Sequence, residues 1–183
     1  KTDGVLFSAR DGYLFEQLFQ KYNALMEKNG EKGVFSCYFP TSRWLALSAA
    51  ICTEDNIREV ANYQRKDSDA VTFLNFILGE ENVLEYDAKK YSTYEDYFLA
   101  HKEMLYLKSK QLKKKYEVYL KNRNVSLTGK YLFTDLVSSG TTQDALNRIF
   151  DGRLRGCYLY RAYSPIERTL QIISVYDKDN AED

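Results

Sequence analysis

The sequence is poor in the residues that form metal centres, disulfides and membrane helices. Its 183 residues include one histidine, His101, and three cysteines, Cys37, Cys52 and Cys157, with no C-x-x-C spacing. This pattern excludes a zinc-type ligand cluster and a disulfide framework, and it indicates a reduced, cytoplasmic setting. No apolar run approaches the roughly 18 residues that a membrane helix requires, and no signal peptide is visible, so we expect no transmembrane segment.

The sequence also lacks an excess of charge of either sign. Lysine plus arginine and aspartate plus glutamate both number 26. A chain without net charge has no global field that would steer it onto nucleic acid, so any anion site must be local. The stretch "KSKQLKKKYEVYLKNR" mixes lysines with tyrosines, but we interpret its charges as the solvated face of a helix. We therefore expect a small or neutral partner and no nucleic acid.

The apolar content suffices for one sizeable core, since 44% of the residues are hydrophobic and 15% are aromatic. Strand-like and helix-like segments alternate at both ends of the chain. "GVLF" and "VFSCYF" each precede a helical pattern, and a strand at 130–135 precedes a helix at 141–150. Further strands are expected at 155–161 and near "TLQIISV". This alternation predicts an α/β fold with a mostly parallel sheet flanked by helices, whose ligands lie at the carboxyl ends of the strands.

Residues 53–128 differ from both ends because they lack strand-like alternation. The part from 93 to 123 reads as one long helix with an apolar stripe. We predict an inserted helical lobe, a hood at 53–128, within a single domain of residues 1–183. The chain begins with Lys1 rather than Met, so we expect it to be cut from a longer two-domain protein.

The segment "TDLVSSGTTQDAL" places a hydroxyl-rich loop between the strand at 130–135 and the helix that follows. Gly140 leaves room for an anion near the backbone, and the helix start supplies N–H groups. Asp135 offers an acceptor-only carboxylate that vicinal sugar hydroxyls would satisfy. The segment therefore fits a sugar phosphate, while an ordinary helix capped by Thr141 is the alternative. The candidate phosphate-binding residues are Ser138, Ser139, Gly140, Thr141 and Thr142.

This segment resembles the phosphoribosyl pyrophosphate motif of type I phosphoribosyltransferases. That motif has a hydrophobic strand, two acidic residues, two hydrophobics and small or hydroxyl residues around a glycine. The resemblance implies a phosphoribosyltransferase-like fold in which Asp135 contacts the ribose hydroxyls and the loop from Ser138 to Thr142 holds the 5-phosphate. Thr134 replaces the first acidic residue, which weakens the expected carboxylate help with metal and ribose.

"VLFSARDGYLFEQLF" resembles the pyrophosphate loop of the same family. The resemblance implies that Arg10, Asp11 and Gly12 lie against the pyrophosphate. Arg43, in "TSRW", follows the second strand on the same sheet edge, so we favour pyrophosphate binding over a local contact at a helix start. The implied cofactor is Mg²⁺, held mainly by the pyrophosphate, with no protein metal ligand assigned.

Four segments, in chain order, resemble the second domain of bacterial polysaccharide-biosynthesis proteins that pair a haloacid-dehalogenase-type phosphatase with a phosphoribosyltransferase-like domain. The resemblance covers both ends of the chain and is weak across 53–128. It implies a glycosyl-phosphoribosyltransferase that moves ribose 5-phosphate from phosphoribosyl pyrophosphate to a sugar hydroxyl in O-antigen or capsule synthesis. The phosphatase would then leave a ribofuranose. The segments are "FSARDGYLFEQLF", "YFPTSRWLAL", "KYLFTDLVSSGTTQDALNRI" and "LRGCYLYRAY".

Several alternatives remain open at this point. Asp11 would act as the general base for the sugar hydroxyl, or it would only stabilise its turn. The helical insertion favours a glycan acceptor over the nucleobase of other phosphoribosyltransferases, whereas Thr134 favours a non-catalytic regulator that binds phosphoribosyl pyrophosphate. The expected partners are phosphoribosyl pyrophosphate, a glycan acceptor and a phosphatase domain or protein. We expect His101 to be a packed residue rather than a catalyst.

Overall fold

The computed structural model describes residues 2–9, 11–63, 69–79, 87, 89–151, 153–163 and 170–177. The chain divides into two compact units. The first, which we call the α/β unit, comprises Lys1–Arg43 and Leu120–Asp183, and the second, the helical unit, comprises Trp44–Tyr119. The division therefore falls at different residues from the 53–128 boundaries suggested by the sequence pattern.

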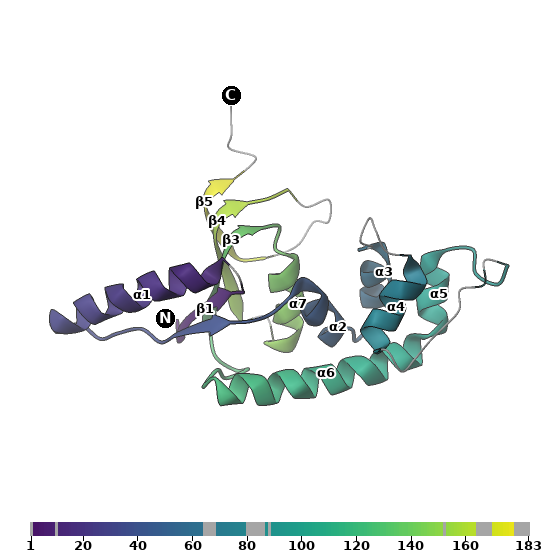
Figure 1. Ribbon diagram of the computed structural model, residues 1–183, viewed down its shortest axis with the longest axis horizontal. Coiled ribbons are helices and arrows are strands. Elements are labelled where there is room, and N and C mark those ends of the chain that lie inside the picture. The colour runs from purple at the N-terminus through teal and green to yellow at the C-terminus, as the bar shows by residue number, and fades with distance from the viewer. Residues whose placement is uncertain are drawn as a thin grey trace, which may run out of the picture. The chain divides into compact units, whose positions relative to one another are not determined.

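The α/β unit is built on a parallel sheet (Figure 1). Among the described residues the sheet has five strands in the order β2-β1-β3-β4-β5, and all neighbouring strands are parallel. This confirms the α/β fold expected from the alternation of strands and helices. The order reverses between β1 and β3, and open α/β sheets bind ligands at such a point, outside the carboxyl ends of the strands. The strands are β1 Gly4–Ser8, β2 Ser36–Phe39, β3 Tyr131–Ser138, β4 Leu154–Arg161 and β5 Ile172–Asp177.

Helices α1, Gly12–Lys28, and α7, Thr141–Ile149, cover opposite faces of this sheet (Figure 1). Successive residues of a strand point to opposite faces. Phe7 of β1 contacts Phe19 of α1, with ring centroids 5.5 Å apart, so the face that carries Phe7 is the α1 face. Tyr158 of β4 lies on the other face and bonds to Gln143 of α7. After β1 the chain therefore passes from the carboxyl edge to one face of the sheet through α1, and after β3 it passes to the other face through α7.

The core of the α/β unit is densest on the α7 face. Phe39 and Phe133 are fully buried and meet edge to face, with ring centroids 6.4 Å apart. Phe150, just after α7, packs against Tyr131 at 6.3 Å. Each such side chain contributes about 1.5–3 kcal/mol by its burial. The apolar residues of α7 and of the position just after it are buried, and they are Ala145, Leu146, Ile149 and Phe150.

The helical unit packs its helices around aromatic side chains. Phe73 lies at the centre, 4.4 Å from the ring of Trp44 and 5.9 Å from that of Phe98. No helix in the described part of the chain is long and apolar enough to cross a bilayer. The helices in this region are α2 Arg43–Ala49, α3 Glu54–Asn62, α4 Ala70–Leu78, α5 Tyr94–Ala100 and α6 Lys102–Asn122.

The single helix expected over 93–123 is wrong, because the chain forms α5 and α6 with a break at His101. The backbone of His101 leaves helical geometry, with φ −107° and ψ 19°. Its Nδ1 atom lies 2.7 Å from the carbonyl oxygen of Tyr97, and its ring packs 4.8 Å from the Tyr97 ring. These contacts agree with the interpretation of His101 as a packed residue. Periodicity did not reveal the break, since the apolar pattern continues through it.

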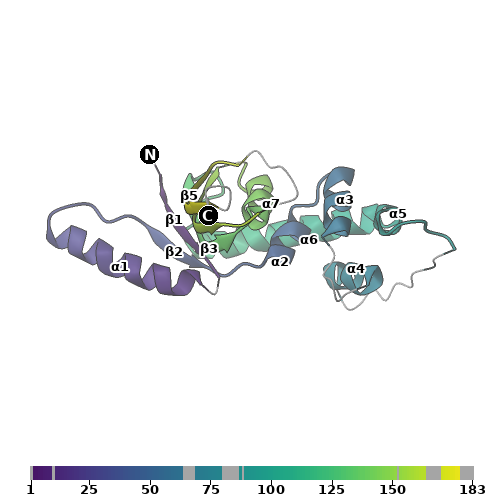
Figure 2. The same ribbon diagram turned by 90° about the horizontal axis from the view of Figure 1, so that it is seen from above.

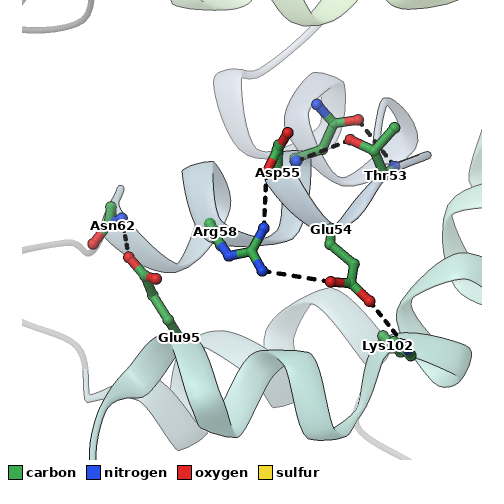
Figure 3. A network of polar contacts seen from close by, with 8 residues as sticks. Thr53, Glu54, Asp55, Arg58, Asn62, Glu95 and Lys102 are labelled. Carbon is green, nitrogen blue, oxygen red and sulfur yellow. Dashed lines mark hydrogen bonds and ion pairs between the residues drawn. The ribbon is translucent and has the colours of Figure 1, made fainter.

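Polar contacts on the surface of the helical unit join α3 to α5 and α6 (Figure 3). Asn62 donates to Glu95 at 2.6 Å, and Lys102 donates to Glu54 at 2.8 Å. Arg58 also bonds to Glu54, one turn earlier in α3. The hydrogen bond and charge of Lys102 lower the pKa of the Glu54 carboxyl, and the same hydrogen bond with the charge of Glu54 raises the pKa of Lys102. Because these groups are well exposed, their contribution to stability is small.

Candidate functional site

Strands β1 and β3 are neighbours at the point where the strand order reverses. Phe7 pairs with Thr134, so Ser8, the last residue of β1, lies level with Asp135. The strand expected at 130–135 is longer in the structure and runs to Ser138. Asp135 therefore lies within β3 rather than at its end. It shares the α7 face with its neighbour in register, Tyr158, whereas Thr134 shares the α1 face with Phe7.

Asp135 is half-buried, and its Oδ1 atom accepts a hydrogen bond of 2.9 Å from the N–H of Leu136. Ligands of parallel sheets bind at the carboxyl ends of the strands, and the carboxylate of Asp135 lies in this part of the sheet. Asp135 directly follows Thr134, which is the last residue of β3 that pairs with β1. It lies three residues before the loop at 138–142. Its expected contact with ribose hydroxyls stays a prediction.

The loop at 138–142 is tightly organised by its own hydroxyl groups. Ser138 is buried, and its Oγ atom accepts the N–H of Gly140 at 3.2 Å. The hydroxyls of Ser139 and Thr141 lie 3.2 Å apart. Thr141 is the first residue of α7 and is buried, while Thr142 is half-buried. The loop therefore presents a fixed backbone rather than a set of mobile hydroxyls.

Helix α7 begins without a side-chain cap. Its N-cap residue is Gly140, in a left-handed conformation with φ 84°, and no side chain bonds to the first turn as a cap. The alternative of an ordinary helix capped by Thr141 is therefore wrong. The first N–H groups of a helix have no partner within the helix, and the helix dipole favours a negative charge beside them. An anion near this helix start would complete the missing cap.

Gly140 has a structural reason to be glycine that the sequence analysis did not give. Its φ of 84° is strained for residues with a side chain, and a Cβ atom there would lie 2.7 Å from Cδ1 of Leu170. From the sequence, the missing Cβ of Gly140 was interpreted as room for an anion. This interpretation must be corrected, because the side chain of Leu170 occupies that space. The glycine allows the loop to pack beside the segment that leads into β5.

A buried polar network holds the start of α7 to the sheet. Gln143 is fully buried, and its Oε1 atom accepts the hydroxyl of Tyr158 at 2.5 Å. Its Nε2 atom donates to the carbonyl oxygens of Leu154 and Gln171, both at 3.2 Å. Burial, with a smaller effect of the Asp135 charge, raises the pKa of Tyr158, while a hydrogen bond from Ser138 opposes this. The network links the phosphate-loop candidate to β4 and to the segment before β5.

Gln143 and Tyr158 were not among the site residues predicted from the sequence. One signal was present, because Gln143 lies one turn before Leu146 in the apolar stripe of α7, where a polar residue is unexpected. Gly156 gave a second signal, since a Cβ atom at this position would overlap Oε1 of Gln143 and approach the Tyr158 ring at 2.9 Å. A glycine within a strand often marks such a close approach.

The loop after β1 has an exposed carboxylate at the start of α1. Asp11 is the N-cap residue of α1, but its side chain makes no capping bond. Gly12 is buried, and a Cβ atom there would lie 2.7 Å from the backbone carbon of Phe7. The missing side chain of Gly12 therefore allows the start of α1 to pack on the end of β1. This role does not depend on any ligand. Arg10 lies outside the described residues, so its expected contact with pyrophosphate stays a prediction.

Arg43 is exposed and is the first residue of α2, which follows β2 at the carboxyl edge of the sheet. Strand β2 is the neighbour of β1, so Arg43 and the loop at 9–12 follow adjacent strands. This is the position that the sequence analysis expected for it. Its role in binding pyrophosphate stays a prediction.

Helix α1 also buries a charged residue that the sequence analysis did not single out. Glu16 accepts hydrogen bonds from Gln17, at 2.9 Å, and from Gln20. Burial raises the pKa of the Cys37 thiol in β2, Arg123 opposes this shift, and the charge of Glu16 adds to it. Because the two glutamine side chains satisfy the carboxylate, we interpret Glu16 as part of the packing of α1 near β2.

The carboxylates at the site fit a magnesium ion that is held mainly by a bound pyrophosphate. In the described ranges, no three or more His, Cys, Asp or Glu side chains form a metal-binding group. Mg²⁺ commonly takes one or two carboxylates together with phosphate oxygens and water. Asp11 is exposed and Asp135 is half-buried, so both supply the oxygen ligands that this ion prefers.

Comparison with known proteins gives no family for this chain. No protein-family model matches the sequence, and no curated protein matches it significantly. The function therefore has to be argued from the site itself and from the motifs quoted above.

Proposed function

We propose that this protein is a Mg²⁺-dependent glycosyl-phosphoribosyltransferase, which transfers ribose 5-phosphate from phosphoribosyl pyrophosphate to a sugar hydroxyl. The observation that supports the proposal most is the position of two loops, 9–12 and 138–142, after the adjacent strands β1 and β3. They flank the point where the strand order reverses. Each loop leads into a helix N-terminus without a side-chain cap, and such helix starts attract anions. Phosphoribosyl pyrophosphate carries anionic groups at both ends of its ribose.

Each part of the substrate has a proposed place. The 5-phosphate binds the first turn of α7 with the hydroxyls of Ser139 and Thr142, while Ser138 holds the loop through the N–H of Gly140. The ribose hydroxyls donate to Asp135. The pyrophosphate lies against the loop at 9–12, with Arg10 and Arg43 as its cationic partners.

In the reaction the bond between C1 of ribose and the pyrophosphate oxygen breaks, and positive charge develops on the ribose ring. The acceptor hydroxyl oxygen forms the new bond to C1 and gives its proton to the carboxylate of Asp11. Bound Mg²⁺ would neutralise charge on the departing pyrophosphate. The main task of the protein is to hold both anionic ends of the substrate so that the acceptor oxygen approaches C1.

The choice of a sugar acceptor rests on the four sequence segments and their order along the chain. The tyrosines of the helical unit add no support. Tyr97 is fully buried among Tyr91, Phe98 and His101. Tyr97 therefore belongs to the core and does not stack on a sugar.

The proposal is tested by mass spectrometry of the purified protein with Mg²⁺, phosphoribosyl pyrophosphate and a panel of glycosides, purines, pyrimidines and orotate. We expect pyrophosphate release and the added mass of ribose 5-phosphate on a glycoside, while the nucleobases stay inert. Asp11→Asn should slow transfer by roughly 10²-fold or more if the carboxylate is the general base. Asp55→Asn, at an exposed acid of the helical unit, is the matched control and should keep the wild-type rate.

Two results would overturn the proposal. Rapid conversion of a nucleobase would assign the protein to the nucleobase phosphoribosyltransferases. Tight binding of phosphoribosyl pyrophosphate without transfer to any acceptor would assign it to non-catalytic regulators, which the threonine at position 134 would suit.

A further inference from the structure

Helix α1 carries an apolar stripe that nothing in the described structure covers. Leu14, Leu18, Tyr22 and Leu25 are spaced by four, four and three residues, so they lie along one flank of the helix. Each of these side chains is 54–63% exposed. The opposite flank of α1 faces β2, where Tyr13 contacts Tyr38 with ring centroids 5.6 Å apart. The stripe therefore lies on the flank of α1 that is turned away from β2.

The sheet has an apolar strip on the same face as α1. Phe7, Thr134, Cys157 and Ile173 are paired in register across the sheet, so they share the α1 face. Leu159 and Val175 lie two residues further along β4 and β5 and also point to this face. Ile173 is 46%, Leu159 40% and Val175 68% exposed.

A parallel sheet is normally covered by helices on both faces. Among the described helices of the α/β unit, α1 packs on β1 and β2, and α7 packs on the opposite face at β4 (Figures 1 and 2). The stripe of α1 and the strip of β4 and β5 are both exposed, and together we call them the α1–β5 apolar face. It consists of Leu14, Leu18, Tyr22, Leu25, Leu159, Ile173 and Val175.

We propose that a second copy of this chain covers the α1–β5 apolar face in a two-fold symmetric dimer. Each copy offers both an apolar helix flank that is exposed and a sheet surface without a covering helix, so a two-fold axis satisfies both at once. In such a dimer, α1 of one copy lies over β4 and β5 of the other. This interface is independent of the proposed transferase activity.

The size of the surface also suits a dimer. With about 60–120 Å² for each aliphatic side chain and about 150–250 Å² for the tyrosine, the exposed fractions correspond to an apolar area on the order of 400 Å² per chain. A stable interface typically buries about 800 Å² per partner, of which about 65% is apolar in homodimers, so this face would supply most of the apolar part.

The experiment is sedimentation velocity of the full chain from low to high micromolar concentration, without substrate. We expect the wild-type protein to sediment with twice the mass of one chain. Leu18→Glu on α1 and Val175→Glu on β5 should each raise the dissociation constant of the dimer about 100-fold or more, because each buries an unpaired charge. Both wild-type side chains are exposed, so circular dichroism should show that the variants remain folded.

Leu107→Glu and Val118→Glu on α6 are the matched controls. They place the same charge at side chains that are 62% and 56% exposed but belong to the helical unit. Both should remain dimeric. A monomeric wild-type protein, a dimer that survives either Leu18→Glu or Val175→Glu, or growth beyond two copies would overturn the proposal. Any of these results would mean that a second copy of the chain does not cover the α1–β5 apolar face in the proposed way.

Discussion

The two units of the molecule bury different kinds of side chain. In both, the core is built from aliphatic and aromatic residues and includes buried hydroxyl groups, but the α/β unit also buries an amide and a carboxylate. Among the described residues the helical unit buries only serines as polar side chains. The buried polar residues of the α/β unit are Ser8, Glu16, Ser138, Thr141 and Gln143, and those of the helical unit are Ser48 and Ser109.

The buried polar side chains mark the positions where an apolar residue would be expected if stability alone selected the sequence. A buried polar group destabilises the fold unless it is hydrogen-bonded. In the helical unit the polar contacts are mostly at the surface, as between Glu54 and Lys102 (Figure 3). In the α/β unit four of the five buried polar residues lie at the carboxyl edge of the sheet or in the helix start beside it. The polar interior therefore coincides with the proposed site.

The largest effect on this comparison is expected for Gln143→Leu. The change keeps the size of the side chain but leaves the hydroxyl of Tyr158 and the carbonyls of Leu154 and Gln171 without this partner. We expect the free energy of unfolding, measured with urea, to fall by about 2–4 kcal/mol, since each unsatisfied buried group costs about 1–3 kcal/mol. Gln111→Leu, at an exposed position of α6, is the control and should change it by about 0.5 kcal/mol or less. A Gln143→Leu protein as stable as wild type would contradict the role of the network.

A smaller effect, on binding rather than stability, is expected for Asp135→Asn. The amide cannot replace a charged acceptor for the ribose hydroxyls, so the affinity for phosphoribosyl pyrophosphate should fall by about 1–3 kcal/mol. Calorimetric titration with Mg²⁺ present measures this change, with Asp55→Asn as the control in the helical unit. Wild-type affinity of the Asp135→Asn protein would remove Asp135 from the site.

Removal of a buried hydroxyl from the helical unit should matter less. Ser48 donates to the carbonyl oxygen of Trp44 at 2.7 Å, one turn earlier in the same helix. That carbonyl already belongs to a helical hydrogen-bonding pattern, so Ser48→Ala should lower the free energy of unfolding by less than about 1 kcal/mol. The same urea experiment measures it. A loss equal to that of Gln143→Leu would mean that the two units do not differ in their dependence on buried polar groups.

The smallest effect is expected at the surface pair of Glu54 and Lys102. Because Lys102 lowers the pKa of Glu54, the pair stabilises the fold above the ordinary pKa of 4.5. This contribution disappears as the pH falls through the lower pKa of the folded state. Lys102→Met should therefore be slightly less stable than wild type at neutral pH, and the difference should vanish in acid. Thermal unfolding across this pH range checks the sign, and a difference that grows in acid would contradict it.

The alternation of strands and helices was enough to predict the α/β fold, because parallel strands and their helices follow each other along the chain. The break at His101 was not predictable from periodicity, since the apolar pattern of α5 continues into α6. At the site, the sequence identified the loop at 138–142 and its helix. It did not show that Ser138 accepts the N–H of Gly140 or that Gln143 accepts the hydroxyl of Tyr158, because these contacts depend on how the loop and α7 pack on the sheet. The length of β3, and hence the depth of Asp135 in the sheet, also depends on its pairing with β4.

The central claim is that phosphoribosyl pyrophosphate binds the α/β unit where β1 and β3 end. The most direct test is a titration of the isotope-labelled protein with phosphoribosyl pyrophosphate and Mg²⁺, followed by the amide resonances in nuclear magnetic resonance. We predict that the largest changes fall on residues 9–12 and 138–142, with a smaller change at Asp135 and its neighbours. Inorganic phosphate alone should affect mainly 138–142. Changes confined to residues 44–119, or no change at saturating ligand, would contradict the account.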